Sequence, residues 1–169
     1  PQGSFRRIGK HVFVASPVFI LALMAAKLGP IELAMLGFEM CGTYAYDRAA
    51  QDGFVARRRL AGVQDIVAAC ADLAGSHGIK LLRTVVPWII DNARSPMEAE
   101  LSLRFCLRQG RGGYGVPKPE LNPKMTLTAR AAMIAGERHA YPDLFWRSTD
   151  DPNKGLDVEY LGYGSHVNR

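Results

Sequence analysis

The sequence is poor in cysteine, and the few cysteines that it has do not form a pattern. Cys41, Cys70 and Cys106 are the only three, an odd number, and they are far apart within apolar stretches of helical character. A disulfide framework or a zinc site needs more cysteines or closer spacing. We therefore expect reduced thiols in a hydrophobic core, no disulfide, no structural metal and a cytoplasmic location.

A long hydrophobic run is also missing. The most apolar segment, Val12 to Ala26, has 15 uncharged residues, fewer than the roughly 20 that a membrane span needs. It follows several basic residues, so its layout resembles a signal peptide. Ser16 followed by Pro17 is instead typical of a helix start. We therefore favour a buried strand over Lys10–Ala15 and a helix over Pro17–Leu28, with the targeting segment as the alternative.

Several catalytic motifs are absent. The glycines at 112, 113 and 115 lack the spacing and the Lys-Ser/Thr ending of a phosphate-binding loop. His11, His77 and His139 lack metal-ligand spacing. No Ser-His-Asp or Cys-His arrangement, internal repeat or low-complexity segment is visible. These absences remove the commonest nucleotide-binding, zinc-dependent and nucleophilic enzyme classes.

The composition itself is ordinary. The chain has 169 residues, of which 48% are hydrophobic and 22% charged, with 21 Lys and Arg against 16 Asp and Glu. These values predict one or two small globular domains. The net charge of +5 is divided almost evenly between the parts before and after Arg94, so it is weak evidence for a nucleic-acid partner.

The chain divides into two predicted modules. Residues 1–93 form a mainly helical module with a short N-terminal strand, and residues 94–169 form an α+β domain. In the first module the apolar spacing predicts helices over 30–41, 63–73 and 79–91, the last kinked at Pro87. In the second, Ser95, Pro96 and Glu98 form a capping-box helix start, and the helix should reach about Gln109. Three strands follow, over 120–128, 141–147 and 156–161.

Acidic residues within the last two strands are the most informative feature. Side chains alternate between the faces of a strand, and a hairpin that turns about Asp151 would place Asp143 directly opposite Glu159, with Asp157 on the same face as Glu159. Carboxylates brought together among apolar residues need a proton or a cation, and Mg²⁺ suits such a pair. The alternative, more common on spacing alone, is a solvated polar face. For Glu98, helix capping is a sufficient explanation.

Short motifs in the second module carry a resemblance. They are Ser95-Pro96-Met97-Glu98, the stretch Gly112 to Asn122, Asp143-Leu144-Phe145-Trp146, and Asp157-Val158-Glu159-Tyr160-Leu161-Gly162 with His166 after it. With them, the segment 95–166 resembles restriction-endonuclease-like proteins of the PD-(D/E)XK superfamily. Very-short-patch repair endonucleases and the C-terminal domains of AbiEi-type antitoxins and related bacterial regulators are similar examples. The first module resembles the region that precedes this domain in such proteins.

The resemblance implies a helix and a three-stranded sheet around one divalent metal, Mg²⁺. It implies that Asp143 and Glu159 are direct metal ligands, that Glu98 is a ligand or a water-mediated support, and that His166 transfers or positions a proton. The sequence departs from the pattern at Leu161, where the superfamily often has lysine. The chain also stops before the later helix and strand of the core, so we expect a segment of a longer protein, truncated at the C-terminus.

The function that follows is a metal-dependent DNA endonuclease-like activity in defence, repair or toxin–antitoxin regulation. DNA is the expected partner, together with a protein of a toxin–antitoxin or defence system, and no membrane is expected. Arg104, Arg108 and Arg111 would lie on one helix face and contact phosphates, although a solvated face is the commoner reading. The alternative function, which Leu161 favours, is a catalytically inactive, antitoxin-like DNA-binding regulator.

Overall fold

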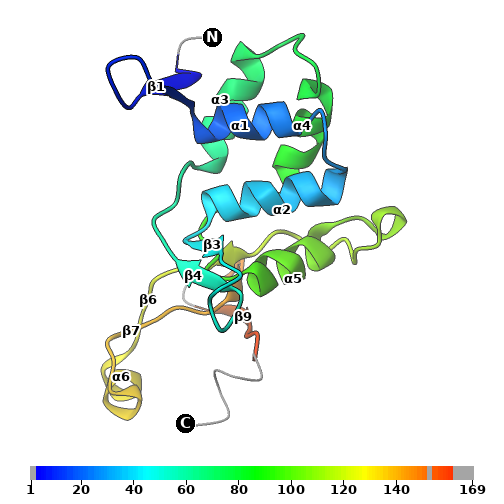
Figure 1. The fold of residues 1–169 in the computed structure, drawn as a ribbon. Helices are drawn as coiled ribbons and strands as arrows, with labels where there is room; N and C mark the ends of the chain where they lie inside the picture. The colour runs from blue at the N-terminus through cyan, green and yellow to red at the C-terminus, as the bar shows by residue number, and fades with distance from the viewer. Residues whose placement is uncertain (1–2, 152–153, 162–169) are drawn as a thin grey trace. The chain divides into compact units, whose positions relative to one another are not determined.

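The protein has an α+β fold, as the sequence predicts. The computed structural model describes residues 3–151 and 154–161, which form helices and small antiparallel sheets (Figure 1). The chain divides into two compact units, Pro1–Leu103 and Arg104–Arg169. The division falls within one helix, α5, rather than before it, and each unit is described by itself below.

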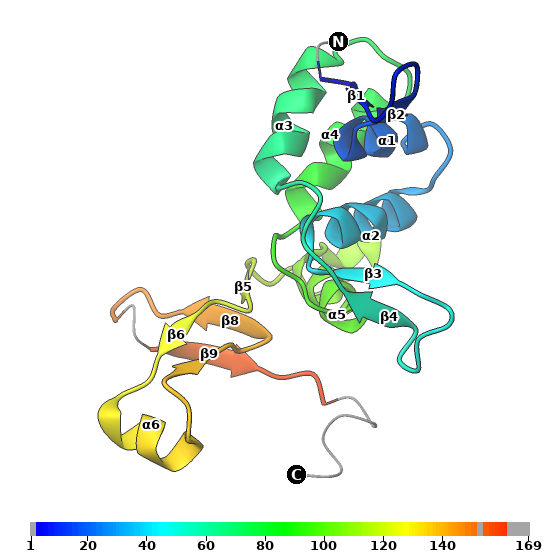
Figure 2. The same cartoon turned by 60° about the vertical axis from the view of Figure 1, so that its left-hand side comes forward.

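Helices dominate the first unit. Its elements are β1 (Phe5–Arg7), β2 (Phe13–Ala15), α1 (Pro17–Met24), α2 (Pro30–Cys41), β3 (Tyr44–Tyr46), β4 (Phe54–Ala56), α3 (Val63–Asp72), α4 (Ile79–Val85), the 3-10 turn η1 (Val86–Trp88) and the start of α5 (Pro96–Cys106). Helix α2 packs against α1 and α4 (Figure 2). Its buried face includes Leu33, Phe38 and Cys41, each fully removed from solvent, so α2 is the centre of this core.

The sequence signals at the helix starts are confirmed. Ser16 is the N-cap of α1 and Pro17 its first residue, which separates the apolar segment into strand β2 and a helix. The prediction that the strand over Lys10–Ala15 is buried is wrong, because Phe13 and Val14 of β2 are exposed, and the helix ends at Met24 before the predicted Leu28. Gly42 ends α2. Among the residues that the structure describes, no helix is long and apolar enough to cross a membrane. Cys41, Cys70 and Cys106 are free thiols, and burial raises the pKa of Cys41 to about 12, so that thiol is unreactive.

The first unit differs from the sequence predictions in two further places. The helix predicted over 79–91 ends at Val85 and tightens into η1, because Pro87 has no N–H to continue the helical hydrogen bonds. Between α2 and α3, where no element was predicted, the chain forms the β3–β4 hairpin, in which Tyr44 pairs with Ala56. These strands have three residues each, too few for side-chain alternation to be visible in the sequence.

The second unit contains a three-stranded antiparallel sheet. Its elements are the end of α5, the 3-10 turn η2 (Gln109–Arg111), β5 (Glu120–Leu121), β6 (Met125–Thr126), α6 (Ala129–Ala135), β7 (His139–Ala140), β8 (Leu144–Arg147) and β9 (Gly155–Val158). The strand order is β5-β8-β9, and β6 pairs separately with β7. Figures 1 and 2 both show α6 at the end of the β6–β7 ribbon.

The single strand predicted over 120–128 is therefore wrong. It is interrupted after Leu121 because Asn122 has a positive φ of 49° and Pro123 cannot donate a hydrogen bond. The chain leaves the sheet at this point, forms β6, α6 and β7, and returns at β8. Helix α6 buries none of its residues, and all of its seven residues except Arg130 are apolar, so no amphipathic pattern distinguished an apolar face from which the helix could be predicted.

The turn before α4 gives a test of the fold. Gly78 has a φ of 82°, and a Cβ there would lie 2.7 Å from the backbone nitrogen of Ala26. We expect Gly78→Ala to lower the free energy of unfolding by at least about 2 kcal/mol, since left-handed strain adds to a backbone clash. Chemical denaturation measures the change.

Gly75 provides the matched control. Its φ of 87° is similar, but a Cβ there meets nothing within 4 Å. Gly75→Ala should therefore cost only about 1 kcal/mol, the conformational strain alone. Equal losses for the two variants would show that the contact with Ala26 does not constrain the fold.

Candidate functional site

The β8–β9 hairpin brings carboxylates together. The strands pair with Leu144 opposite Val158 and Phe145 opposite Asp157. The same register, continued by one residue, sets Asp143 opposite Glu159, as the spacing predicts. The backbone N–H of Tyr160 donates a 2.8 Å hydrogen bond to Oδ2 of Asp143, so the two strands remain in contact at this point.

The electrostatics show that these carboxylates interact. Although Glu159 is an exposed residue, partial loss of water around its carboxylate, followed by the negative charges of Asp143 and Asp157, raises the pKa of Glu159 to about 7. A hydrogen bond with Asp143 contributes to the same shift. Near neutral pH Glu159 is therefore protonated in about half of the molecules, and the group can take up or release a proton.

Asp157 is the third member of this group. Partial desolvation raises the pKa of Asp157, a hydrogen bond with Glu159 lowers it, and the charge of Asp143 raises it again. The alternation along β9 already placed Asp157 on the same face as Glu159, but the resemblance gave it no role. Below, the name acidic group means Asp143, Asp157 and Glu159.

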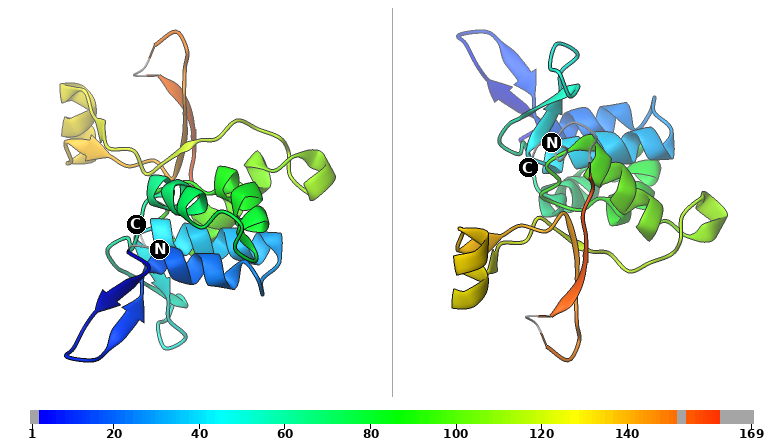
Figure 3. Two further views of the ribbon diagram at one scale, coloured as in Figure 1. Left: turned by 90° about the horizontal axis from the view of Figure 1, so that it is seen from above. Right: turned by 90° about the horizontal axis from the view of Figure 1, so that it is seen from below.

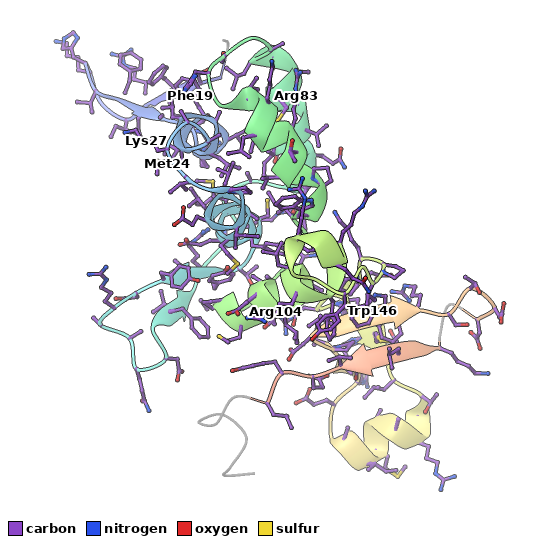
Figure 4. All side chains as sticks on the ribbon, turned by 90° about the vertical axis from the view of Figure 1, so that its right-hand side faces the viewer. Phe19, Met24, Lys27, Arg83, Arg104 and Trp146 are labelled. Carbon is purple, nitrogen blue, oxygen red and sulfur yellow. The ribbon has the colours of Figure 1, made fainter. Side chains whose placement is uncertain are left out.

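Aromatic packing and one ion pair hold the hairpin in place within the second unit. Leu144 and Phe145 are buried in β8. The ring of Trp146 meets that of Phe105 edge to face at 5.7 Å, and its Nε1 donates a 2.6 Å hydrogen bond to the carbonyl of Pro117 (Figure 4). Arg147 forms a two-pronged ion pair with Glu120 on β5. These contacts fix β8 against its neighbours and so position Asp143 at its start.

Glu98 occupies a different environment. It is 5% exposed, and its Oε2 accepts a 2.9 Å hydrogen bond from the N–H of Arg94, while its Oε1 accepts one of 3.0 Å from the hydroxyl of Ser95. Ser95 in turn accepts a hydrogen bond from the N–H of Glu98. The capping box is thus confirmed. Glu98 belongs to the first unit and the acidic group to the second, so a metal site shared by all of them remains a prediction.

The other predicted site residues are not brought together. Helix α5 ends at Cys106, so the expectation that it reaches Gln109 is wrong. Arg104 lies in its last turn, Arg108 precedes η2 and Arg111 lies within it. All three are exposed, but they do not form the single helix face that their spacing predicted. Their role as phosphate contacts stays a prediction.

Leu161 and His166 are the remaining positions for which the sequence made a prediction. Leu161 is 71% exposed, which is unusual for leucine and consistent with a surface position two residues after Glu159. His166 lies outside the described residues. Across residues 3–151 and 154–161, no three His, Cys, Asp or Glu side chains are arranged so that they could hold one metal ion.

Comparison of the chain with protein-family models, curated protein sequences and solved structures found no match. The resemblance to PD-(D/E)XK proteins rests on its short motifs alone. The geometry that bears on function is consequently that of the chain itself, above all the acidic group.

The acidic group yields a pH prediction. Asp143→Asn removes a negative charge and changes the hydrogen bond with Glu159, so the pKa of Glu159 should fall from about 7 toward its ordinary value of 4.5. A pH titration of the side-chain carboxyl carbon of Glu159 by NMR measures it. Asp150→Asn, an exposed change in the same hairpin, is the control. An unchanged titration in Asp143→Asn would contradict the coupling.

The raised pKa of Glu159 also predicts how the free energy of unfolding changes with pH. The folded pKa of Glu159 lies above the unfolded one, so its protonation stabilises the fold below about pH 4.5, and that contribution is lost as the pH rises through about 7. The free energy of unfolding of the wild type should therefore decrease across this window relative to that of Glu159→Gln. Denaturation curves at several pH values compare the two proteins, and parallel pH profiles would contradict the assignment.

Proposed function

We propose that this chain is a Mg²⁺-dependent DNA endonuclease-like protein of the PD-(D/E)XK type, acting in defence, repair or toxin–antitoxin regulation. The observation that carries the proposal is that Asp143, directly before β8, and Glu159, directly after β9, lie at the same end of an antiparallel strand pair, where the N–H of Tyr160 donates to Asp143. The order of a capped helix, α5, followed by the sheet β5-β8-β9 supports it.

The chemistry of the acidic group fits Mg²⁺. Carboxylate oxygens are the ligands that this ion prefers, and it binds through one or two of them while it keeps several waters. Partial loss of water and then the negative charges of Asp143 and Asp157 raise the pKa of Glu159, and a cation would relieve the repulsion between these charges. Asp143 and Glu159 would hold the ion, and Asp157 lies near enough to interact with Glu159.

Each residue then has a definite task. The N–H of Tyr160 holds the Asp143 carboxylate in one orientation. Glu159 would be ionised with a cation beside it, because the cation offsets the charges of Asp143 and Asp157, and it would serve as the second ligand. Bound Mg²⁺ would supply charge stabilisation for a phosphodiester and a lower pKa for water. We further propose that Glu98 supports the site through water, that His166 transfers a proton, and that Arg104, Arg108 and Arg111 contact phosphates.

Cleavage of DNA tests the proposal. With Mg²⁺, the wild-type protein should nick supercoiled plasmid, and Asp143→Asn should reduce the rate by at least about a hundredfold, because a metal ligand is lost. Asp150→Asn serves as a control of equal charge change and should cleave at the wild-type rate. Agarose gels quantify the nicked product. Equal rates for Asp143→Asn and wild type would remove the acidic group from the mechanism.

A second function is favoured by Leu161. An exposed leucine stands where the superfamily often has a catalytic lysine, and both carboxylate oxygens of Glu98 already accept hydrogen bonds at the helix start. We propose as the alternative a catalytically inactive nuclease-fold protein that binds DNA and regulates transcription, as an antitoxin does. Binding without cleavage separates this alternative from the first proposal.

Replacing the leucine tests the alternative directly. If Leu161 is the reason for inactivity, the wild type should bind DNA in a salt-dependent way without cleaving it. Leu161→Lys should then gain Mg²⁺-dependent nicking that a second change, Asp143→Asn, removes. Leu156→Lys, which changes another exposed leucine on β9 nearer the turn of the hairpin, should gain nothing. Strong cleavage by the wild type would exclude the alternative.

A further inference from the structure

The net charge of the protein is concentrated at one end of the sequence. Residues 1–31 contain four Lys and Arg residues and no Asp or Glu, whereas the rest of the chain is nearly balanced, with 17 against 16. Three of the four cations, Arg6, Arg7 and Lys10, belong to the β1–β2 hairpin, and His11 follows them. A segment without acidic residues produces a local positive electrostatic potential. The net charge of the whole protein, which is small, does not reveal this local potential.

Apolar side chains are exposed on both faces of this hairpin. The register pairs Arg6 with Val14 and Arg7 with Phe13, and the N–H of Ile8 donates to the carbonyl of Val12. Alternation therefore puts Phe13 on one face and Ile8, Val12 and Val14 on the other. Ile8 is 66% and Phe13 61% exposed. A two-stranded ribbon with large apolar groups uncovered on both sides is unusual for a free surface.

The hairpin is nevertheless held firmly at its base and tip. At the base, the N–H of Ser16 donates a 2.8 Å hydrogen bond to the carbonyl of Ser4, and the ring of Phe5 meets that of Phe19 on α1 at 5.3 Å. At the tip, the guanidinium of Arg7 donates to the carbonyls of Gly9 and Lys10 at 2.9 and 2.7 Å. Arg7 is thus a structural residue of the turn.

Arg6 and Lys10 are exposed and are the cations of this hairpin that are available to a ligand. Both views of Figure 3 show the hairpin projecting from the helices of the first unit. Figure 4 labels Phe19 on α1, at the foot of the projection. The hairpin is therefore a preformed, positively charged ribbon with both faces accessible.

We infer that the β1–β2 hairpin inserts into a groove of duplex DNA. The major groove admits a two-stranded β-ribbon, and its two walls would meet the two exposed faces of this ribbon at once. Arg6 and Lys10 would neutralise phosphates, while Ile8 and Val12 near the tip would contact sugars and thymine methyl groups. A lipid surface would instead meet the tip or one face only, so it leaves the other face uncovered.

The choice of duplex DNA rests on the function proposed above, but the hairpin lies in the first unit and its binding needs no metal. Binding is therefore measured in EDTA, by fluorescence anisotropy of a short labelled duplex at several salt concentrations. Each phosphate contact contributes about 0.9 to the slope of log affinity against log salt. Arg6→Ala/Lys10→Ala should reduce the slope by about 2 and weaken binding roughly tenfold or more.

A matched variant controls for the loss of charge. Lys27→Ala/Arg48→Ala removes two exposed cations from outside the hairpin, and it should retain the wild-type slope. Ile8→Ser should weaken binding without changing the slope, because it removes an apolar contact only. Identical slopes for the two double variants would overturn the inference.

Two further outcomes separate this inference from the proposed function. Wild-type protein that binds vesicles of phosphatidylserine and phosphatidylcholine, but no duplex, would overturn the DNA inference in favour of a lipid surface. Mg²⁺-dependent cleavage that requires Asp143, together with hairpin variants that bind DNA normally, would overturn the inference and leave the nuclease proposal standing. Hairpin-dependent binding without cleavage would support the inference and reject the nuclease proposal.

Discussion

The pairing of β8 with β9 is the constraint on which the second unit depends. Leu144 and Phe145 of β8 are both buried, and because consecutive residues of a strand point to opposite faces, they cover both faces of β8. The register pairs Phe145 with Asp157, and a slip of β9 by one residue would turn its carboxylates to the other face, away from Asp143. The same pairing that joins β8 to β9 therefore brings Asp143, Asp157 and Glu159 into interaction.

Glu98 is a residue for which both a structural role at a helix start and a functional role at a metal site were considered. A buried carboxylate must be compensated, and here the N–H of Arg94 and the hydroxyl of Ser95 compensate it. The helix start explains the residue completely without any ligand. A structural role in the helix cap does not prevent Glu98 from having a functional role as well. However, since the cap already explains why a glutamate stands at this position, its presence there is not evidence for catalysis. The functional argument then depends on the β8–β9 hairpin alone.

The predictability of the fold followed the strength of the local signals. Helix starts and ends were predicted well, because the residues that cause them act on the neighbouring backbone alone. The helices begin or end at these residues, which are Ser16-Pro17, Gly42 and Ser95-Glu98. Strands of two or three residues, such as β5 and β6, are too short to carry alternation, so the sequence could not reveal them. Helix α6, which buries nothing, gave no apolar stripe.

The candidate site was predictable only in part, for the same reason. Alternation and a symmetric turn were enough to set Asp143 opposite Glu159, because β-pairing has a fixed period. The hydrogen bond from the N–H of Tyr160 to Asp143 could not be foreseen, since it involves the backbone of the opposite strand. The alignment of Arg104, Arg108 and Arg111 failed because it assumed that a helix continues past Cys106.

If DNA is the ligand, as proposed above, the charges of the two hairpins act on it in opposite ways. The β1–β2 hairpin, with its cations and no acid, attracts phosphates without assistance. The β8–β9 hairpin repels them unless a cation binds there, or unless Glu159 is protonated, which its pKa of about 7 allows only in part near neutral pH. Binding of DNA and cleavage of DNA would then be separate properties of this chain. Salt would weaken the binding, whereas cleavage would require the cation that the acidic group needs.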